Sequence, residues 1–310
     1  MSRRPTASTR LLCVGHASID HQFEIDTLPM PPGKIAARRH GRGVGGMSAN
    51  AALAATRLGV HAAFAGPVGD DETAALIDAH FARVGIEPRG LVRIAGAQSS
   101  ISAVLIDARG ERLIVTHRGD ALQRAPAFDP AWLAGIDMLL VDPRCAVWAE
   151  AALSAARERG ITSVLDGDVA PRADLRRLAP LARWAVFSEP GLAAFDDAEA
   201  GTALAHAIDS GAEHAVVTLG ERGLLWLARG EPLRALPAFV VSPVVDTTGA
   251  GDVFHAALGV ALAEGRAGEA ALRFASAAAA LKCLRPNGAD GAPSRAEVEA
   301  LLRGGNPTAT

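Results

Sequence analysis

The order of apolar runs in the second half of the chain constrains the fold most. Short apolar runs at Met138–Val141, Thr162–Leu165 and Trp184–Phe187 read as buried strands, and a helical pattern follows each of them. Strands that alternate with helices favour a parallel sheet, because each parallel connection must cross a face of the sheet. The sequence therefore predicts an α/β fold whose mostly parallel central sheet carries helices on both faces.

The remaining elements extend this alternation in both directions. Further strands are expected at Leu11–Val14, Ala62–Ala65, Ala215–Thr218, Leu224–Trp226 and Phe239–Val241. Helices are expected at Ser48–Leu58, Thr73–Val84, Ala146–Arg159, Leu175–Ala182, Thr202–Ser210, Gly251–Ala263, Glu269–Leu281 and Ser294–Leu302.

Two segments, at about 16–44 and 98–118, do not follow the alternation. Ser99–Ile106 and Glu111–His117 flank a turn and predict a hairpin, and His21–Ile25 alternates polar with apolar residues. We expect these segments to form a small β-sheet lid over one end of a single domain at 11–302. Residues 1–10 and 303–310 are expected to be flexible termini.

Composition narrows the class of partner. The net charge of −3 over 310 residues gives no electrostatic case for nucleic acid or an anionic membrane. The three cysteines are far apart in sequence and are expected to be reduced thiols, as in a cytoplasmic protein. The apolar run after the basic N-terminus is too short for a signal peptide.

The stretch Asp246–Asp252, DTTGAGD, carries the strongest chemical signal. Its glycines allow backbone N–H groups to approach an anion at the start of a helix, where the helix dipole adds positive charge. A carboxylate beside such an anion hole repels phosphate unless it has a task, and accepting a proton from an attacking hydroxyl is one. Asp252 alone is also compatible with a simple acidic helix start.

Other catalytic patterns carry less weight. Gly41–Gly46 matches G-x-G-x-x-G, but about 26 residues separate it from the first strand, which disfavours a dinucleotide site. The chain contains no G-x-x-x-x-G-K-[ST], no H-E-x-x-H and no G-x-S-x-G motif.

Several motifs together resemble one known family. DTTGAGDVF is similar to the C-terminal signature of the ribokinase-like (PfkB) carbohydrate kinases, and Gly43–Gly59 resembles their N-terminal signature. Val68–Asp71 resembles the family's VGDD stretch, and Thr218–Gly223 its nucleotide loop. The resemblance covers residues 11–302 and implies a ribokinase-like fold with ATP and Mg²⁺ as cofactors.

The resemblance also implies residue roles. Asp252 would be the catalytic base, and the backbone of Gly249, Ala250 and Gly251 the anion hole. Sugar hydroxyls would be bound by Asp20, Gly45, Gly46 and Asn50. The nucleotide would contact Thr218, Gly220, Gly223, Ser276 and Asn287. Many relatives organise Mg²⁺ with Asn-x-x-Glu, whereas this chain has Ser188 and Gly191 there, so Glu189 or Asp168 is expected to take part of that role.

Within the family, the loops look most similar to ketose kinases of the sulfofructose kinase, ketohexokinase and fructokinase branch. The Gly33–Lys34 pair and Arg144 would then bind the far end of the sugar, including an anionic group there. Both cations are equally compatible with solvated surface positions.

The resulting expectation is an ATP-dependent kinase of a small sugar, such as fructose or a derivative. The alternatives are a ribose or nucleoside kinase of the same family, or an inactive sugar- or nucleotide-binding regulator. A lid with one apolar face is a poor isolated unit, so a homodimer through the lid is also expected.

Overall fold

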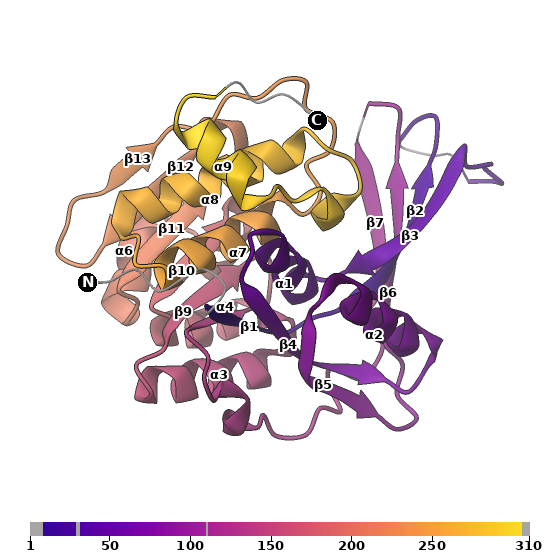
Figure 1. The fold of residues 1–310 in the computed structure, drawn as a ribbon, viewed down its shortest axis with the longest axis horizontal. Helices are drawn as coiled ribbons and strands as arrows, with labels where there is room; N and C mark the ends of the chain where they lie inside the picture. The colour runs from indigo at the N-terminus through magenta and orange to yellow at the C-terminus, as the bar shows by residue number, and fades with distance from the viewer. Residues whose placement is uncertain (1–8, 29–31, 110, 306–310) are drawn as a thin grey trace.

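The computed structural model describes residues 9–28, 32–109 and 111–305 (Figure 1). A nine-stranded sheet forms the body, and its strands run in one direction except for β12, which pairs antiparallel with both β11 and β13. The spatial order is β13 (Arg234–Leu236), β12 (Leu224–Ala228), β11 (His214–Thr218), β10 (Trp184–Ser188), β9 (Thr162–Gly167), β8 (Met138–Val141), β1 (Arg10–Val14), β4 (His61–Gly69) and β5 (Glu87–Ile94).

The inner strands of the body divide their side chains between two apolar cores. In β1, Leu11 and Cys13 belong to one core, while Leu12 and Val14 belong to the other. The first core is covered by α1 (Met47–Arg57), α2 (Glu72–Val84), α7 (Ala250–Ala263), α8 (Gly268–Cys283) and α9 (Arg295–Leu302). The second is covered by α3 (Ala146–Glu158), α4 (Arg172–Leu178), α5 (Glu189–Phe195) and α6 (Ala200–Ser210). The expected α/β architecture with helices on both faces is therefore confirmed.

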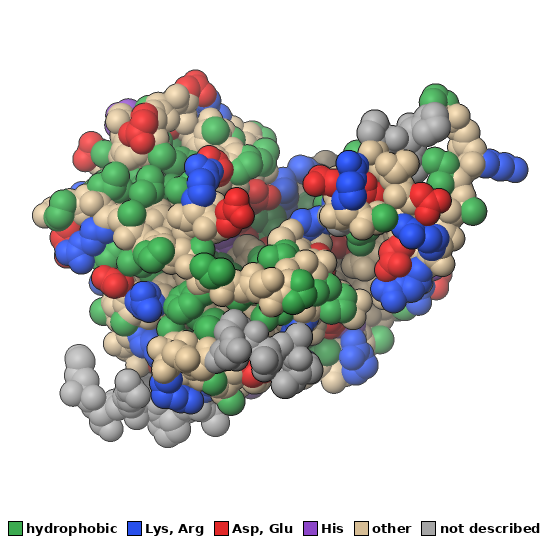
Figure 2. All heavy atoms as spheres, turned by 90° about the horizontal axis from the view of Figure 1, so that it is seen from above, with side chains coloured by type: hydrophobic (Ala, Val, Ile, Leu, Met, Phe, Trp, Pro, Cys, Tyr) green, Lys and Arg blue, Asp and Glu red, His purple; other side chains and the backbone are tan. Residues whose placement is uncertain are grey.

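A second sheet projects from one side of the body (Figure 1), and we call it the lid. Its order is β3 (Arg39–Gly45), β2 (Ser18–Glu24), β6 (Ser100–Ile106) and β7 (Arg112–His117). Figure 2 shows the molecular surface hollowed where this sheet meets the body. The hairpin and the strand near His21 match the expected lid segments.

The register gives the lid two unlike faces. Asp20, Ser102 and Thr116 are cross-strand partners and share one face. Arg112 lies on that face too, and its guanidinium contacts the hydroxyls of Thr247 and Thr248 in the body. The opposite face carries apolar side chains, of which Ile101, Leu113 and Val115 are 38%, 46% and 61% exposed. The polar face is thus turned toward the motif that ends in Asp252.

Several sequence expectations were wrong in detail. Phe239–Val241 is not a strand: β13 ends at Leu236, and the following Pro237 has no N–H to continue a ladder. Val244–Val245 is a loop as well, because the amide of Val245 donates to the Cys283 carbonyl instead of to a strand.

Two strands were missed by the sequence interpretation. The segment Gly41–Gly46, for which the sequence predicted no strand, lies largely in β3. β5 has the sequence EPRGLVRI, whose proline, glycine and charged residues are uncommon in strands and so did not predict one. The structure pairs it with β4 at the edge of the sheet.

The predicted flexible termini lie mostly outside the described residues, although Arg10 already belongs to β1. Across the described ranges, no helix is long and apolar enough to cross a membrane. The cytoplasmic location stays a prediction.

Candidate active site

Two helices begin beside each other at the edge of the body that the lid covers. Asn50 lies in the first turn of α1 and Asp252 in the first turn of α7. The Asn50 Nδ2 donates to Asp252 Oδ2 at 2.7 Å, although 202 residues separate the two in sequence. The two signature motifs, which are far apart in sequence, therefore lie side by side in the fold.

Asp20 reaches this site from the lid. Its Oδ1 accepts a hydrogen bond of 3.0 Å from Ser18 Oγ. A Cβ added to Gly45 would lie only 2.0 Å from Asp20 Oδ2, so the carboxylate packs directly on that glycine. Gly46 has a φ of 95° and precedes α1, where a Cβ would meet the His16 carbonyl oxygen at 2.5 Å. Side chains at 45 and 46 would close the space beside Asp20.

The start of α7 leaves an opening with free donors. Gly249 adopts a φ of 74° as the residue before the helix. Within the described chain, the amides of Gly249, Gly251 and Asp252 donate to no protein acceptor. The Ala250 amide, which was also expected in the anion hole, instead donates to the Thr247 carbonyl oxygen at 3.2 Å, and the Asp252 amide is free in its place. A Cβ at Gly251 would meet nothing within 4 Å, so the backbone there is open to a ligand. This geometry suits an anion at the helix N-terminus.

The environment of Asp252 favours its protonated form. Burial is the largest influence and raises the pKa of Asp252, and the nearby Asp166 carboxylate raises it further. The hydrogen bond from Asn50 acts in the opposite direction. A carboxyl group with a raised pKa is a better proton acceptor when it is ionised, which is what a general base requires.

His255 lies one helical turn beyond the anion hole and is buried. Its Nδ1 is 2.7 Å from the Gly251 carbonyl oxygen and 3.4 Å from Asp166 Oδ2, and its Nε2 is 3.3 Å from the Val186 carbonyl oxygen. Burial lowers the pKa of His255. The imidazole therefore ties the first turn of α7 to the ends of β9 and β10, a role that the sequence did not reveal.

Asp142 makes a second connection between distant segments, which the sequence analysis did not predict. It is fully buried after β8, and its Oδ2 accepts hydrogen bonds from the His16 amide at 2.7 Å and the Ser48 hydroxyl at 2.6 Å. The Asp142 carboxylate thus holds the start of α1, and with it Asn50. Its position at the end of an apolar run was the available signal.

The expected nucleotide residues divide into two groups. Thr218 ends β11, and Gly220 and Gly223 follow on the loop to β12, where a Cβ at Gly223 would meet the Leu236 carbonyl oxygen at 2.0 Å. Ser276 lies within α8, and Asn287 adopts a φ of 70° just before η6 (Gly288–Gly291). Among the described residues, no hydrogen bond or ion pair joins the two groups.

The expected metal residues stand at the ends of adjacent strands. Asp168 accepts a hydrogen bond of 2.9 Å from Ser188 Oγ, and Glu189 Oε2 is 2.6 Å from Arg222 Nη2. Nowhere in the described chain do three or more metal-binding side chains gather. Both carboxylates still fit Mg²⁺, which takes one or two carboxylates and fills its other positions with water and phosphate oxygens.

The residues expected at the far end of the sugar differ in setting. Arg144 is mostly buried, with Nη1 2.8 Å from the Val169 carbonyl oxygen and Nη2 3.4 Å from Asp168 Oδ2. Lys34 is exposed, and Gly33 has open space around it. Arg144 therefore contacts Asp168, whereas Lys34 is exposed to solvent.

A surface hollow of about 620 Å³ lies away from this site. Its lining includes Arg157, Glu213 and His214, at the amino-terminal ends of the strands. None of the expected site residues lines it. The candidate active site is therefore defined by side-chain convergence under the lid and not by cavity size.

A parallel sheet, a covering lid and a carboxylate beside an anion hole define an enzyme of the phosphoryl-transfer class. The sequence pattern of the pfkB family carbohydrate kinases matches residues 8–295. The chain therefore belongs to this family and is an ATP-dependent sugar kinase. The ATP and Mg²⁺ expected from the sequence are the cofactors of that chemistry.

Individual relatives agree over nearly the whole chain. A ribokinase of Bacillus subtilis is 30% identical over 306 residues, covering 94% of this chain and 99% of the relative. Fructokinase-1 of Oryza sativa is 28% identical, covering 83% and 88%.

Solved structures give the same result. A chain from Agrobacterium tumefaciens, provisionally assigned as a ribokinase, is 38% identical with a TM-score of 0.90, covering 96% of this chain and 98% of that one. Ribokinase of Arabidopsis thaliana, solved with ribose and ATP, is 25% identical with a TM-score of 0.83, covering 95% and 99%. The ribokinase-like fold is confirmed, whereas the ketose branch receives no specific support.

Proposed function

We propose that this kinase transfers the γ-phosphoryl group of ATP to a hydroxyl of a small sugar held between Asp20, Asn50 and Asp252. The observation that carries the proposal is the convergence of Asn50 and Asp252 at 2.7 Å beside unpaired helix N-terminal amides. The acceptor hydroxyl replaces Asn50 as the partner of Asp252, which accepts its proton. The attacking oxygen then bonds to phosphorus as the bond to the ADP oxygen breaks.

The anion hole stabilises the charge that moves during this transfer. The amides of Gly249, Gly251 and Asp252 point their dipoles to the equatorial phosphoryl oxygens, and the glycine at 251 leaves room for the group. Asp168 and Glu189 would hold Mg²⁺, which neutralises phosphate charge when it is bound. The lid excludes water, so that the sugar and not water accepts the phosphoryl group.

The substrate is proposed from relatives and from the lid. Ribokinases are among the most similar relatives, and fructokinases follow at slightly lower identity, so ribose is placed ahead of the ketoses expected from the sequence. Asp20 and Asn50 suit sugar hydroxyls because a carboxylate accepts and an amide both donates and accepts hydrogen bonds. Arg144 and Lys34 are proposed contacts to the end of the sugar that is not phosphorylated.

The apolar face of the lid supports a homodimer. Ile101, Leu113 and Val115 expose a contiguous face on neighbouring strands, and such a face gains stability when a second copy covers it. We expect light scattering at micromolar concentration to give twice the mass of the chain. A monomer under these conditions would remove the proposal.

The test of function is ADP release from Mg-ATP across a panel of acceptors. The panel holds ribose, fructose, sulfofructose, tagatose, fructose 6-phosphate, 2-keto-3-deoxygluconate and adenosine. We expect turnover that depends on one sugar and is lost in Asp252→Asn. ATP binding without turnover on any acceptor would contradict a sugar kinase and favour a binding protein.

A further inference from the structure

Lys282 is a buried cation that the proposed mechanism leaves without a role. It lies in the last turn of α8, its side chain is fully buried, and its neighbours in sequence are mostly alanine and leucine. A buried ammonium is costly unless oxygens surround it. Its surroundings therefore show what the charge is used for.

Three oxygen atoms surround the ammonium. Nζ donates to the Asp246 carbonyl oxygen at 2.6 Å and to the Arg285 carbonyl oxygen at 3.3 Å, and it lies 3.0 Å from Asp246 Oδ2. Backbone carbonyl oxygens coordinate K⁺ in channels, and carboxylates join carbonyls around other hard cations, so this oxygen set suits a small cation. The three N–H donors of the lysine are matched by these three acceptors.

These contacts join the two loops that border the anion hole. Asp246 begins the Asp246–Asp252 motif, and its carboxylate also accepts from the amides of Thr248 at 2.8 Å and Gly288 at 3.0 Å. A Cβ at Gly249 would lie 3.0 Å from the Ala289 amide nitrogen, so the loops touch. The position of Gly249 therefore depends on the contact between Asp246 and Lys282.

We propose that Lys282 is a tethered cation that holds the anion-hole loop in place, so that catalysis needs no dissolved monovalent cation. This inference rests on the proposed function, since it assigns a positioning residue to the same reaction. The ammonium does not reach the transferred group. It acts through Asp246 by fixing the loop that ends in Gly249.

The test compares two truncations of the same side chain. Lys282→Ala leaves space among the three oxygens for NH4⁺ or K⁺, whereas Lys282→Met fills that space without a charge. We expect kcat to fall by up to about 100-fold in both variants in Na⁺ buffer, the scale of a displaced catalytic loop. NH4Cl or KCl at equal ionic strength should restore kcat in Lys282→Ala and leave Lys282→Met unchanged. Arg273→Ala, an exposed cation on the same helix, is the control and should match the wild type.

Two further measurements keep the proposal testable if the variants fold poorly. Wild-type kcat should be the same in Na⁺ and K⁺ buffers, and K⁺ stimulation of the wild type would overturn the tethered-cation role. The thermal midpoint of Lys282→Ala should rise when NH4⁺ replaces Na⁺, and this readout needs no turnover. Equal midpoints in both salts, with no rescue of kcat, would reduce Lys282 to a folding role. Absence of wild-type turnover with any sugar would instead overturn the proposed function.

Discussion

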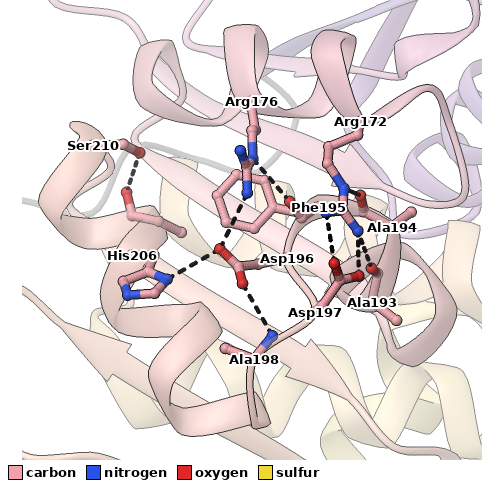
Figure 3. Close-up of polar contacts among 11 residues, drawn as sticks. Arg172, Arg176, Ala193, Ala194, Phe195, Asp196, Asp197, Ala198, His206 and Ser210 are labelled. Atoms are coloured by element: carbon pink, nitrogen blue, oxygen red, sulfur yellow. Dashed lines mark hydrogen bonds and ion pairs between the residues drawn. The ribbon is translucent and has the colours of Figure 1, made fainter.

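Two groups of acidic residues in this molecule behave in opposite ways. At the active-site edge, burial raises the pKa of Asp252 and of Asp166. Between α4 and α6, a surface network of Arg172, Arg176, Asp196, Asp197 and His206 (Figure 3) keeps its carboxylates charged. A hydrogen bond from the Ala198 amide, followed by one from His206, lowers the pKa of Asp196.

The difference arises from partners and solvent, since the residue type is the same. Asp196 accepts from Ala198 N at 3.0 Å and pairs with His206 Nδ1 at 3.0 Å, and Arg176 is 54% exposed. Asp252 has one amide donor and a carboxylate neighbour in place of an arginine. Surface carboxylates paired in water are worth little, whereas buried ones with perturbed pKa values mark functional sites.

The largest expected effect comes from neutralising one carboxylate in each group and comparing the loss of activity. Asp252→Asn should lower kcat/KM about 10²- to 10⁴-fold, because a general base is lost. The matched change in the surface network, Asp196→Asn, should leave steady-state kinetics unchanged. Comparable losses of kcat/KM in both variants would remove the functional distinction between the two groups.

A substitution that adds a methyl group beside Asp20 tests its role in sugar binding without changing any charge. In Gly45→Ala the new methyl group would lie 2.0 Å from Asp20 Oδ2, so the carboxylate must move from the sugar position. We expect the KM for sugar to rise about tenfold or more while the KM for ATP changes little. Gly59→Ala is a poor control because its φ is 82°, whereas Gly41→Ala meets open space on the same strand as Gly45. An unchanged sugar KM in Gly45→Ala would argue against Asp20 as a sugar contact.

The pH profile tests the electrostatic coupling inside the active-site group. The negative charge of Asp166 disfavours ionisation of Asp252, so Asp166→Asn should lower the pKa of Asp252. Because the base acts when ionised, the acid limb of kcat/KM should move to lower pH. Asp209→Asn, an exposed acid on α6, serves as the control and should leave the limb in place. A limb that stays fixed or moves upward in Asp166→Asn would show that Asp166 does not set this pKa.

The smallest effect is on stability in the surface network. The folded-state pKa of Asp196 is depressed, so its contribution to stability is present above the ordinary carboxyl range and is lost as pH falls through the folded-state value. Asp196→Asn should lower the free energy of unfolding by about 0.2–1 kcal/mol at pH 7. Urea titrations should show this difference shrinking below about pH 4. A constant difference between wild type and variant at all pH values would contradict the electrostatic origin.

The sequence correctly predicted the strands and helices whose residue pattern is contained within the element itself. Short continuous apolar runs predicted β8, β9 and β10, and runs of small residues after glycines predicted α1 and α7. β5 and β3 were not predicted because they contain proline, glycine or arginine, which have low strand preference. Hydrogen bonds to the neighbouring strand stabilise them in the fold, and local sequence does not show that pairing. The prediction for Phe239–Val241 was wrong in the other direction: it has strand-forming residues, but Pro237 after β13 cannot donate to a ladder and the segment forms no strand.

The residues around the catalytic group divide in the same way. Asp252, Asn50 and Gly249 were found from the two signatures that contain them. His255, Asp142, Asp166 and Lys282 gain their roles from contacts across the chain, such as the 3.4 Å between His255 and Asp166 and the 2.6 Å between Lys282 and Asp246. A single buried charge in an alanine-rich helix was the only local sign of Lys282.

The sequence by itself determined the α/β class, the lid and the family, and it supplied the residues proposed for the transfer chemistry, because these depend on spacing along the chain. Only the tertiary structure decided which polar and charged side chains come into contact. The Asn50–Asp252 contact spans 202 residues, and the pKa of Asp252 depends on burial and on Asp166 from another strand. Electrostatic energies depend on distance and solvent access in three dimensions, and no local pattern of residues contains either quantity.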